Sequence, residues 1–253
     1  MNRWRLAVSA VAFVVALTSS APTLSAADLP TVDQLLARME EAVSKIQTYE
    51  GDMVTTIASN NSGRMTFHLA REIVMKDGRD IGRASMCFTE THKAPDGKVK
   101  TILQTTNTND GTFSWSETRD FRNNQVRVSK GNAQPMTPPW GLTEDLRFLK
   151  NACQRYGITA VTEATIDGRK MYVLVGALKT DTESSAYWVD QESLLLRRKA
   201  RTTVSQAKGD RPRPLTVTDD YLNLKLNQLI DPKLFEYTPP EGAVVTDKTQ
   251  PKP

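Results

Sequence analysis

The stretch AYWVDQESLLLRRKA occupies residues 186–200 and indicates how this chain folds. Two β-prone runs, 186–190 and 194–200, flank a short polar break, which is the pattern of a β-hairpin. A third β-prone run follows at 215–226, after a proline-rich bend. The segment closes at 230–243, where Pro239 and Pro240 end ladder pairing because neither can donate a backbone N–H. We therefore expect antiparallel strands up to this point.

Two amphipathic helices are predicted upstream of this stretch. Apolar residues recur at helical spacing over 32–48, behind a Thr31 that can cap the first turn, and again over 143–156, before Gly157. Strand-like runs separated by turn signals such as Asp110-Gly111 fill much of the remaining sequence, which is typical of consecutive hairpins. We predict an α+β fold: a strongly curved antiparallel β-sheet forms an unclosed half-barrel, and the amphipathic helices cover its concave face.

The first 27 residues have the pattern of an export signal. Arg3 and Arg5 begin it, an apolar run spans 6–17, and Ser25-Ala26-Ala27 resembles a cleavage site. A membrane anchor is the alternative, but it needs about 20 apolar residues, and this run has 12. We predict a signal peptide at 1–27 cleaved near Ala27, periplasmic localisation, one domain at 28–246, and a disordered tail at 247–253.

Charge and motifs argue against nucleic-acid binding and against catalysis. Without Arg3 and Arg5 the chain keeps 31 of its 33 Lys and Arg residues and all 29 Asp and Glu residues, a formal charge of only +2. His68 and His92 have no ligand partners at metal-binding spacing, and phosphate loops and nucleophile elbows are missing.

Adjacent strand residues point to opposite faces, so Asp219 and Asp220 are interpreted as solvated charges rather than as an acid pair. We predict a non-enzymatic protein without a cofactor or a metal.

Two features leave alternatives open. Cys87 and Cys153 are the only cysteines, and an exported chain permits either a disulfide or two buried thiols. The predicted loop at 206–214 carries Lys208, Arg211 and Arg213. It either docks on an acidic partner or on lipid headgroups, or it is a solvated connector.

The closing segment resembles the LolA-like family of periplasmic carriers, which sort outer-membrane lipoproteins. The resembling elements, in order, are Val189-Asp190, Asn227, Ile230-Asp231, Leu234-Phe235 and Pro239-Pro240-Glu241-Gly242. Tyr49-Glu50-Gly51 after the first helix, and Asp110-Gly111 before Trp115, match as well. The clear likeness covers residues 186–247, about a quarter of the chain. An early Arg-Pro pair of the carriers is replaced here by Arg71-Glu72, so the lid-closing role of that arginine is not carried over.

The resemblance implies a monomeric carrier that shields the acyl chains of lipoproteins or lipids in an apolar cavity. Its partners would be an inner-membrane donor complex and an outer-membrane acceptor. Burying hydrocarbon is worth about 0.8 kcal/mol per CH₂, so such binding needs no reactive residue. Two alternatives remain: a LolA-like lipid-sensing regulatory module, and an enzyme of unknown type.

Alternation along the predicted strands supplies candidate lipid-binding residues, because side chains two apart share a face. The strand candidates are Met65, Phe67, Leu69, Met86, Phe88, Phe113, Trp115, Met171 and Val173. The helix candidates, expected to form a lid, are Leu35, Leu36, Met39 and Leu149. Methionine suits a deformable cavity. The alternative for each of these residues is that it belongs to the ordinary core, and the set supports a cavity better than any single member.

Overall fold

The structure of the 253-residue chain is a computed structural model that describes residues 29–58, 63–76, 79–80, 82–93, 98–133, 142–178, 182–205 and 213–249. The predicted signal peptide at 1–27 and residues 206–212 of the predicted loop lie outside these ranges, so both stay predictions. Within these ranges, no helix is both long and apolar enough to span a bilayer.

The described residues form two α-helices, one short 3-10 helix and a series of strands. The helices are α1 (Val32–Ser44), α2 (Leu142–Arg155) and η2 (Pro232–Phe235). The strands of the first half are β1 (Thr48–Ala58), β2 (Gly63–Glu72), β3 (Met75–Lys76), β4 (Arg79–Asp80), β5 (Ala84–Lys93), β6 (Val99–Asn109), β7 (Phe113–Asp120) and β8 (Gln125–Asn132). Those of the second half are β9 (Thr162–Ile166), β10 (Arg169–Ala177), β11 (Glu183–Asp190), β12 (Leu196–Ser205), β13 (Arg213–Leu226) and β14 (Val245–Asp247).

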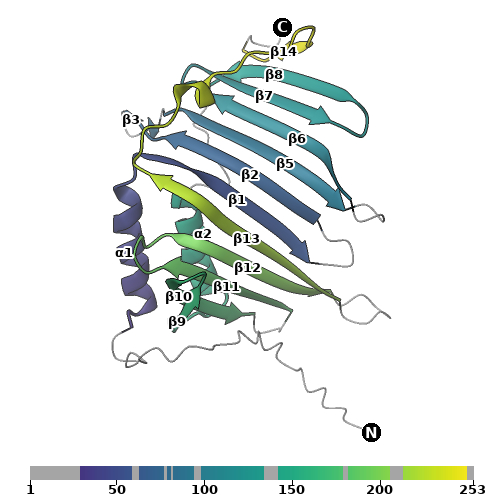
Figure 1. The fold of residues 1–253 in the computed structure, drawn as a ribbon. Coiled ribbons are helices and arrows are strands. Elements are labelled where there is room, and N and C mark those ends of the chain that lie inside the picture. Colours follow the sequence, from purple (N-terminus) through teal and green to yellow (C-terminus); the bar gives the residue numbers. More distant parts are fainter. Residues whose placement is uncertain are drawn as a thin grey trace.

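Twelve of the described strands make one sheet in the order β14-β8-β7-β6-β5-β2-β1-β13-β12-β11-β10-β9. Neighbours pair antiparallel, except that β14 pairs parallel with β8. A first wing, made of β1, β2 and β5 to β8, and a second wing, β9 to β13, meet at the β1–β13 pair in the middle, while β3 and β4 pair with each other in a separate sheet. Figure 1 shows the bent sheet with both helices on one side of it, beside the second wing. The predicted α+β fold with an unclosed, curved sheet is confirmed.

The hairpin predicted from residues 186–200 is present as β11 and β12. The Asp190 carboxylate accepts hydrogen bonds from the Ser193 backbone N–H at 2.7 Å and from the Ser193 hydroxyl at 2.8 Å, and these bonds close the turn. Asp190 is buried. These two local hydrogen bonds stabilise the turn that follows β11.

Helix α1 begins as predicted and ends earlier than predicted. Thr31 and Gln34 form a capping box, in which each side chain accepts from the other residue's backbone N–H. The helix ends at Ser44 rather than near residue 48. There the Asn227 side chain accepts from the Gln47 N–H at 2.7 Å and donates to the Lys45 carbonyl at 3.2 Å. A distant residue therefore sets where the helix gives way to β1.

The sheet has an inner face, which carries the helices, and an outer face. The main core lies between the helices and the inner face, with Leu35, Met53, Leu149 and Leu174 fully buried in it. Each such side chain contributes about 1.5–3 kcal/mol through burial. The register shifts at Gly51, where a Cβ would lie 2.5 Å from Leu224 Cδ2. Bulges of this kind bend a strand and increase its twist.

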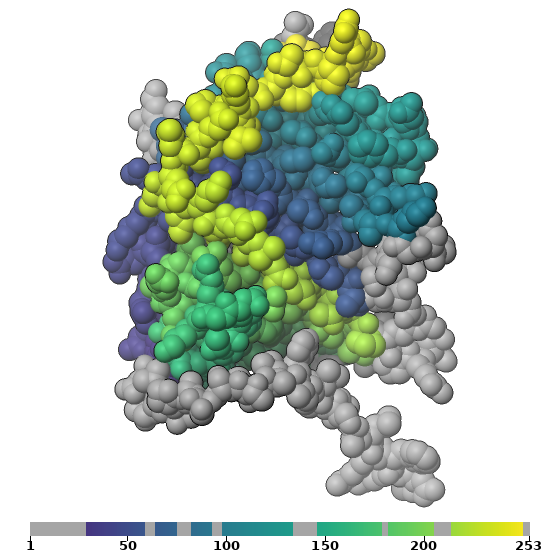
Figure 2. Space-filling model, viewed as in Figure 1, coloured from purple at the N-terminus to yellow at the C-terminus, as the bar shows by residue number. Residues whose placement is uncertain are grey.

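The segment after β13 crosses the strand ends of the first wing on its way to β14, as its yellow colour shows in Figures 1 and 2. Phe235, in η2 of this segment, is buried against Ala70 of β2, and the Arg83 guanidinium lies 4.7 Å from its ring centre. Asp247, where the predicted tail begins, is the last residue of β14, and the Lys248 N–H donates to the Lys130 carbonyl at 2.8 Å. Pairing with β8 thus orders the start of that segment, and residues 250–253 lie outside the described ranges.

Candidate functional site

A cavity of about 880 Å³ lies between the inner face of the sheet and α2. Its volume falls within the roughly 300–1,000 Å³ typical of small-molecule sites. Met65 and Phe67 of β2, with Met86 and Phe88 of β5, form its apolar floor. Phe67 and Phe88 are directly opposite each other in the ladder, and their ring centres are 4.8 Å apart. The floor is therefore one continuous apolar surface across two strands.

One wall of the cavity is the helix α2. Phe148, Asn151, Ala152 and Arg155 contribute to it along successive turns, and Tyr156 extends it directly after the helix ends. Ala152 and Tyr156 are buried, whereas Phe148 lines the cavity and is still 52% exposed. A large apolar side chain in that position marks the mouth, where the cavity meets solvent.

The charged part of the lining, apart from Arg155 of α2, comes from the second wing. Asp219 of β13 is only 8% exposed. Its carboxylate accepts from the Thr55 hydroxyl at 2.5 Å and lies 3.4 Å from Lys199 Nζ. The interpretation of Asp219 as a solvated charge is therefore wrong: inner-face curvature buries it beside the cavity. Asp220 does point to the other face, where it pairs with Arg198.

Four of the predicted lipid-binding residues line this cavity: Met65, Phe67, Met86 and Phe88. Leu69 lies on the same face but is buried in the core beyond the cavity. The predicted lid residues Leu35, Leu36, Met39 and Leu149 are also core residues, which attach the helices to the sheet. They hold α1 and α2 in place and do not line the cavity.

The remaining four predicted residues, Phe113, Trp115, Met171 and Val173, lie on the outer face. Trp115 is opposite Lys130 in the ladder, and its ring centre is 5.3 Å from that of Tyr237 in the C-terminal segment. Met171 and Val173 are buried, but the inner face of their strand belongs to Leu174 and its alternating neighbours. The prediction that these four residues line the cavity is therefore wrong. Pairing with the neighbouring strands turns their side chains to the outer face.

Sequence reasoning missed the polar members of the cavity. The most prominent are Arg155, Ser185, Lys199 and Arg201. Charged residues that alternate along a strand have the same pattern as a solvated face, so no signal in the sequence alone separates the two cases.

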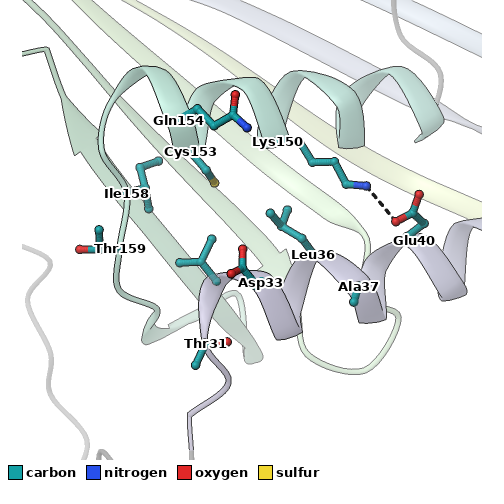
Figure 3. A pocket seen from close by; sticks show the side chains of 11 residues that line it. Thr31, Asp33, Leu36, Ala37, Glu40, Lys150, Cys153, Gln154, Ile158 and Thr159 are labelled. Atoms are coloured by element: carbon teal, nitrogen blue, oxygen red, sulfur yellow. Dashed lines mark hydrogen bonds and ion pairs between the residues drawn. The ribbon is translucent and has the colours of Figure 1, made fainter.

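A second hollow, of about 600 Å³, lies between the two helices (Figure 3). Asp33, Leu36, Glu40, Lys150 and Cys153 are among its lining residues, and Lys150 Nζ lies 2.8 Å from Glu40 Oε2 across it. Its lining is more polar than the floor of the large cavity. This ion pair joins two helix surfaces, so the hollow is a seam between helices and a weaker candidate for binding.

The two cysteines are free thiols on opposite sides of the sheet. Cys87 is paired in register with His68 on the outer face, and its sulfur lies 3.6 Å from Gln104 Nε2. Cys153 belongs to α2, over the inner face. Burial, with a smaller contribution from Asp33, raises the pKa of the Cys153 thiol to about 11. The predicted alternative of two buried thiols is therefore right that the cysteines are unbridged, but only Cys153 is buried and Cys87 is half-buried.

His68 points to the outer face, whereas its neighbour Phe67 points to the inner face. His68 Nδ1 is 2.8 Å from Asp52 Oδ1. Asn223 Nδ2 donates to the other oxygen of Asp52 at 2.8 Å. Burial alone would raise the pKa of Asp52, but the hydrogen bonds from Asn223 and His68 lower it overall. In the part of the chain that the structure describes, no three His, Cys, Asp or Glu side chains come close enough to hold a metal ion.

No protein-family model matches the chain. No curated protein matches it either.

Solved structures do align with the chain. A DUF1329 family protein from Desulfovibrio piger is 16% identical, with 80% of this chain and 95% of that chain covered and a TM-score of 0.32. A LolA superfamily protein from Nitrosomonas europaea is 14% identical, with 83% and 99% covered and a TM-score of 0.27. An S-type phycobiliprotein lyase from Guillardia theta is 8% identical, with 76% and 97% covered and a TM-score of 0.22. A LolA superfamily protein is thus among the solved structures that align with this chain.

Proposed function

We propose that this chain is a periplasmic binding protein that carries acyl chains of lipids or lipoproteins in the cavity between the sheet and α2. The observation that supports this is the continuous apolar floor of Met65, Phe67, Met86 and Phe88 in a cavity of about 880 Å³. Such a surface is suited to hydrocarbon because every methylene that leaves water for it gains free energy.

The expected affinity suits a carrier. About ten buried methylenes would gain roughly 8 kcal/mol, which corresponds to a micromolar dissociation constant before the cost of ordering the chain is counted. Binding of that strength shields a hydrocarbon chain and still allows its release. Two of the four floor residues are methionines, whose flexible thioethers can adapt to chains of different shape.

The cellular setting is part of the same proposal. The export signal at residues 1–27 would direct the chain to the periplasm, where the mature protein would act as a monomer. It would take its cargo from an inner-membrane donor complex and deliver it to an outer-membrane acceptor. This role requires no chemical step on the cargo.

The first experiment measures uptake of a nonionic fluorescent acyl probe by the purified protein, together with mass spectrometry of lipid extracted from it. Phe88→Glu places a charge on the cavity floor and should weaken uptake at least tenfold. The matched control is Val126→Glu, because Val126 is 49% exposed on the outer face. If wild type, correctly folded, takes up no probe and yields no lipid, or if Phe88→Glu takes up probe as wild type does, the proposal is refuted.

A transfer assay separates a carrier from a lipid-sensing module. Donor vesicles that contain a fluorescent acyl lipid are mixed with unlabelled acceptor vesicles, with and without the protein. A carrier speeds the transfer in proportion to protein concentration. Tight binding without faster transfer would favour the sensing module.

A further inference from the structure

A cluster of charged groups marks one end of the cavity. Arg155 Nη2 lies 3.1 Å from Glu183 Oε2, and Arg201 Nε lies 3.9 Å from Glu183 Oε1. The Tyr156 hydroxyl donates to the same carboxylate. Both arginine side chains are more than half exposed and line the cavity, whereas the Glu183 side chain is 13% exposed. Two guanidinium groups therefore share one largely buried carboxylate.

The charge balance at this end favours an additional anion. Arg155, Lys199 and Arg201 supply three positive charges, while Glu183 and Asp219 supply two negative ones. Lys199 already lies beside Asp219. A guanidinium has five N–H donors and can hold a carboxylate or a phosphate with two of them. Glu183 cannot occupy all the donors of two arginines, so some remain for a ligand.

A buried hydroxyl points to the same place. Ser185 lines the cavity, is only 3% exposed, and is directly opposite Arg201 in the ladder between β11 and β12. Among the described residues its Oγ has no hydrogen-bond partner of ordinary geometry, although the Tyr187 hydroxyl is near. A buried hydroxyl without a partner is unfavourable, and a ligand oxygen placed there would remove that penalty.

We infer that the cargo is an amphiphile with an anionic head group, a carboxylate or a phosphate, held by Arg201, Arg155 and Ser185. Its hydrocarbon chain lies over the floor residues of β2 and β5, which line the same cavity. The inference rests on the proposed function and names its substrate class. Charge-assisted hydrogen bonds are stronger than neutral ones, so the head group adds both affinity and orientation.

The test compares three ligands with the same twelve-carbon chain: dodecanoate, dodecyl phosphate and dodecanol. Each displaces a nonionic acyl probe from the purified protein at low ionic strength. At least one of the two anions should bind about tenfold more tightly than the alcohol. Arg201→Gln and, separately, Ser185→Ala should reduce this preference to about threefold or less, with dodecanol binding unchanged.

Arg198→Gln is the matched control. Arg198 lies on the same strand, but it points to the outer face, where it pairs with Asp220 and is 6.0 Å from the Trp188 ring centre. Arg198→Gln removes the same charge as Arg201→Gln, but from the outer face of the sheet, so the anion preference should persist.

The outcomes separate this inference from the proposed function. Tighter binding of dodecanoate indicates a fatty-acid-like head, and tighter binding of dodecyl phosphate indicates a phospholipid-like head; both support the inference. Equal binding of dodecanol, or an equal loss of preference in Arg198→Gln, overturns it and leaves the proposed carrier intact. If the probe binds but none of the three ligands displaces it, only the inference is overturned; if the probe itself does not bind and no lipid is extracted, the proposed function is overturned as well.

Discussion

Gly176 provides a sharp test of how α2 is held against the sheet. It lies on the inner face of β10, opposite Ser185. A Cβ added there would lie 2.6 Å from Ile158 Cγ1, 2.7 Å from Tyr156 Cβ and 2.9 Å from the Tyr156 carbonyl oxygen. The last of these atoms belongs to the backbone, so Gly176→Ala can be accommodated only if the end of α2 moves.

The expected change in the free energy of unfolding follows from two opposing effects. Overpacking a tight contact destabilises by about 1–3 kcal/mol. Alanine in place of glycine inside a strand recovers about 0.5–1 kcal/mol through lower chain entropy. The net expectation for Gly176→Ala is a loss of roughly 0.5–2 kcal/mol.

Gly131→Ala on β8 is the control, because a Cβ there would meet only the rotatable Ser114 hydroxyl, at 3.1 Å. This variant should be neutral or more stable than wild type by up to about 1 kcal/mol. Urea unfolding followed by tryptophan fluorescence measures both variants, provided that the slope of free energy against urea is unchanged. The anion preference of Gly176→Ala should also fall, because Tyr156 would move away from Glu183. If Gly176→Ala proves as stable as Gly131→Ala, the packing described for the end of α2 is incorrect.

Three further predictions concern polar side chains that hold strand pairs and turns together, two of them buried (Asp219 and Asp190) and one exposed (Asn227). Asp219→Asn removes the carboxylate beside Lys199, so the free energy of unfolding measured in urea should fall by about 1–3 kcal/mol. Dodecanoate should bind this variant more tightly in the displacement assay. If neither the stability nor the affinity changes, the buried pair of Asp219 and Lys199 is contradicted. Asn227→Ala removes the acceptor of the Gln47 N–H, an exposed contact, and should lower the free energy of unfolding by about 0.5–1.5 kcal/mol. Hydrogen exchange should become faster at the end of α1; faster exchange only in distant strands would contradict this contact. Burial raises the pKa of Asp190, but the hydrogen bonds from Ser193 lower it by more than burial raises it. The pKa therefore lies below its usual value. The ionised Asp190 therefore stabilises the fold fully above pH about 4, and less as the pH falls through its folded-state pKa. Asp190→Asn should have a lower Tm than wild type at pH 7, and this difference in Tm should narrow below pH about 4. A difference in Tm that is constant with pH would exclude the ionised carboxylate as its cause.

Strand and helix positions could be predicted because they depend on local patterns. Thr31 and Gln34 define the start of α1 within four residues of sequence, and the 186–200 hairpin contains its own turn. The end of α1 could not be predicted, because it depends on Asn227, which approaches only in the folded chain.

Membership of the cavity could be predicted only in part. Phe88 and Trp115 each sit in an alternating apolar pair, and alternation shows that two residues share a face without showing which face it is. The choice depends on the partner strands and, for Trp115, on Tyr237 from the C-terminal segment. The same limit hid Arg201 and Ser185, whose positions beside the cavity follow from sheet curvature rather than from their neighbours in sequence.

The seam between β1 and β13 also dictates the order in which the chain can assemble. Thr55 and Asp219 are 164 residues apart in sequence, yet they are partners in the ladder. The first wing can form from successive hairpins soon after synthesis. One edge of β1, however, keeps its backbone N–H and C=O groups without hydrogen-bond partners until β13 has been synthesised. Bare strand borders recruit other chains, and pairing over such long separations is slow. A newly made molecule would thus pass through an interval of vulnerability to aggregation, which ends when β13 docks.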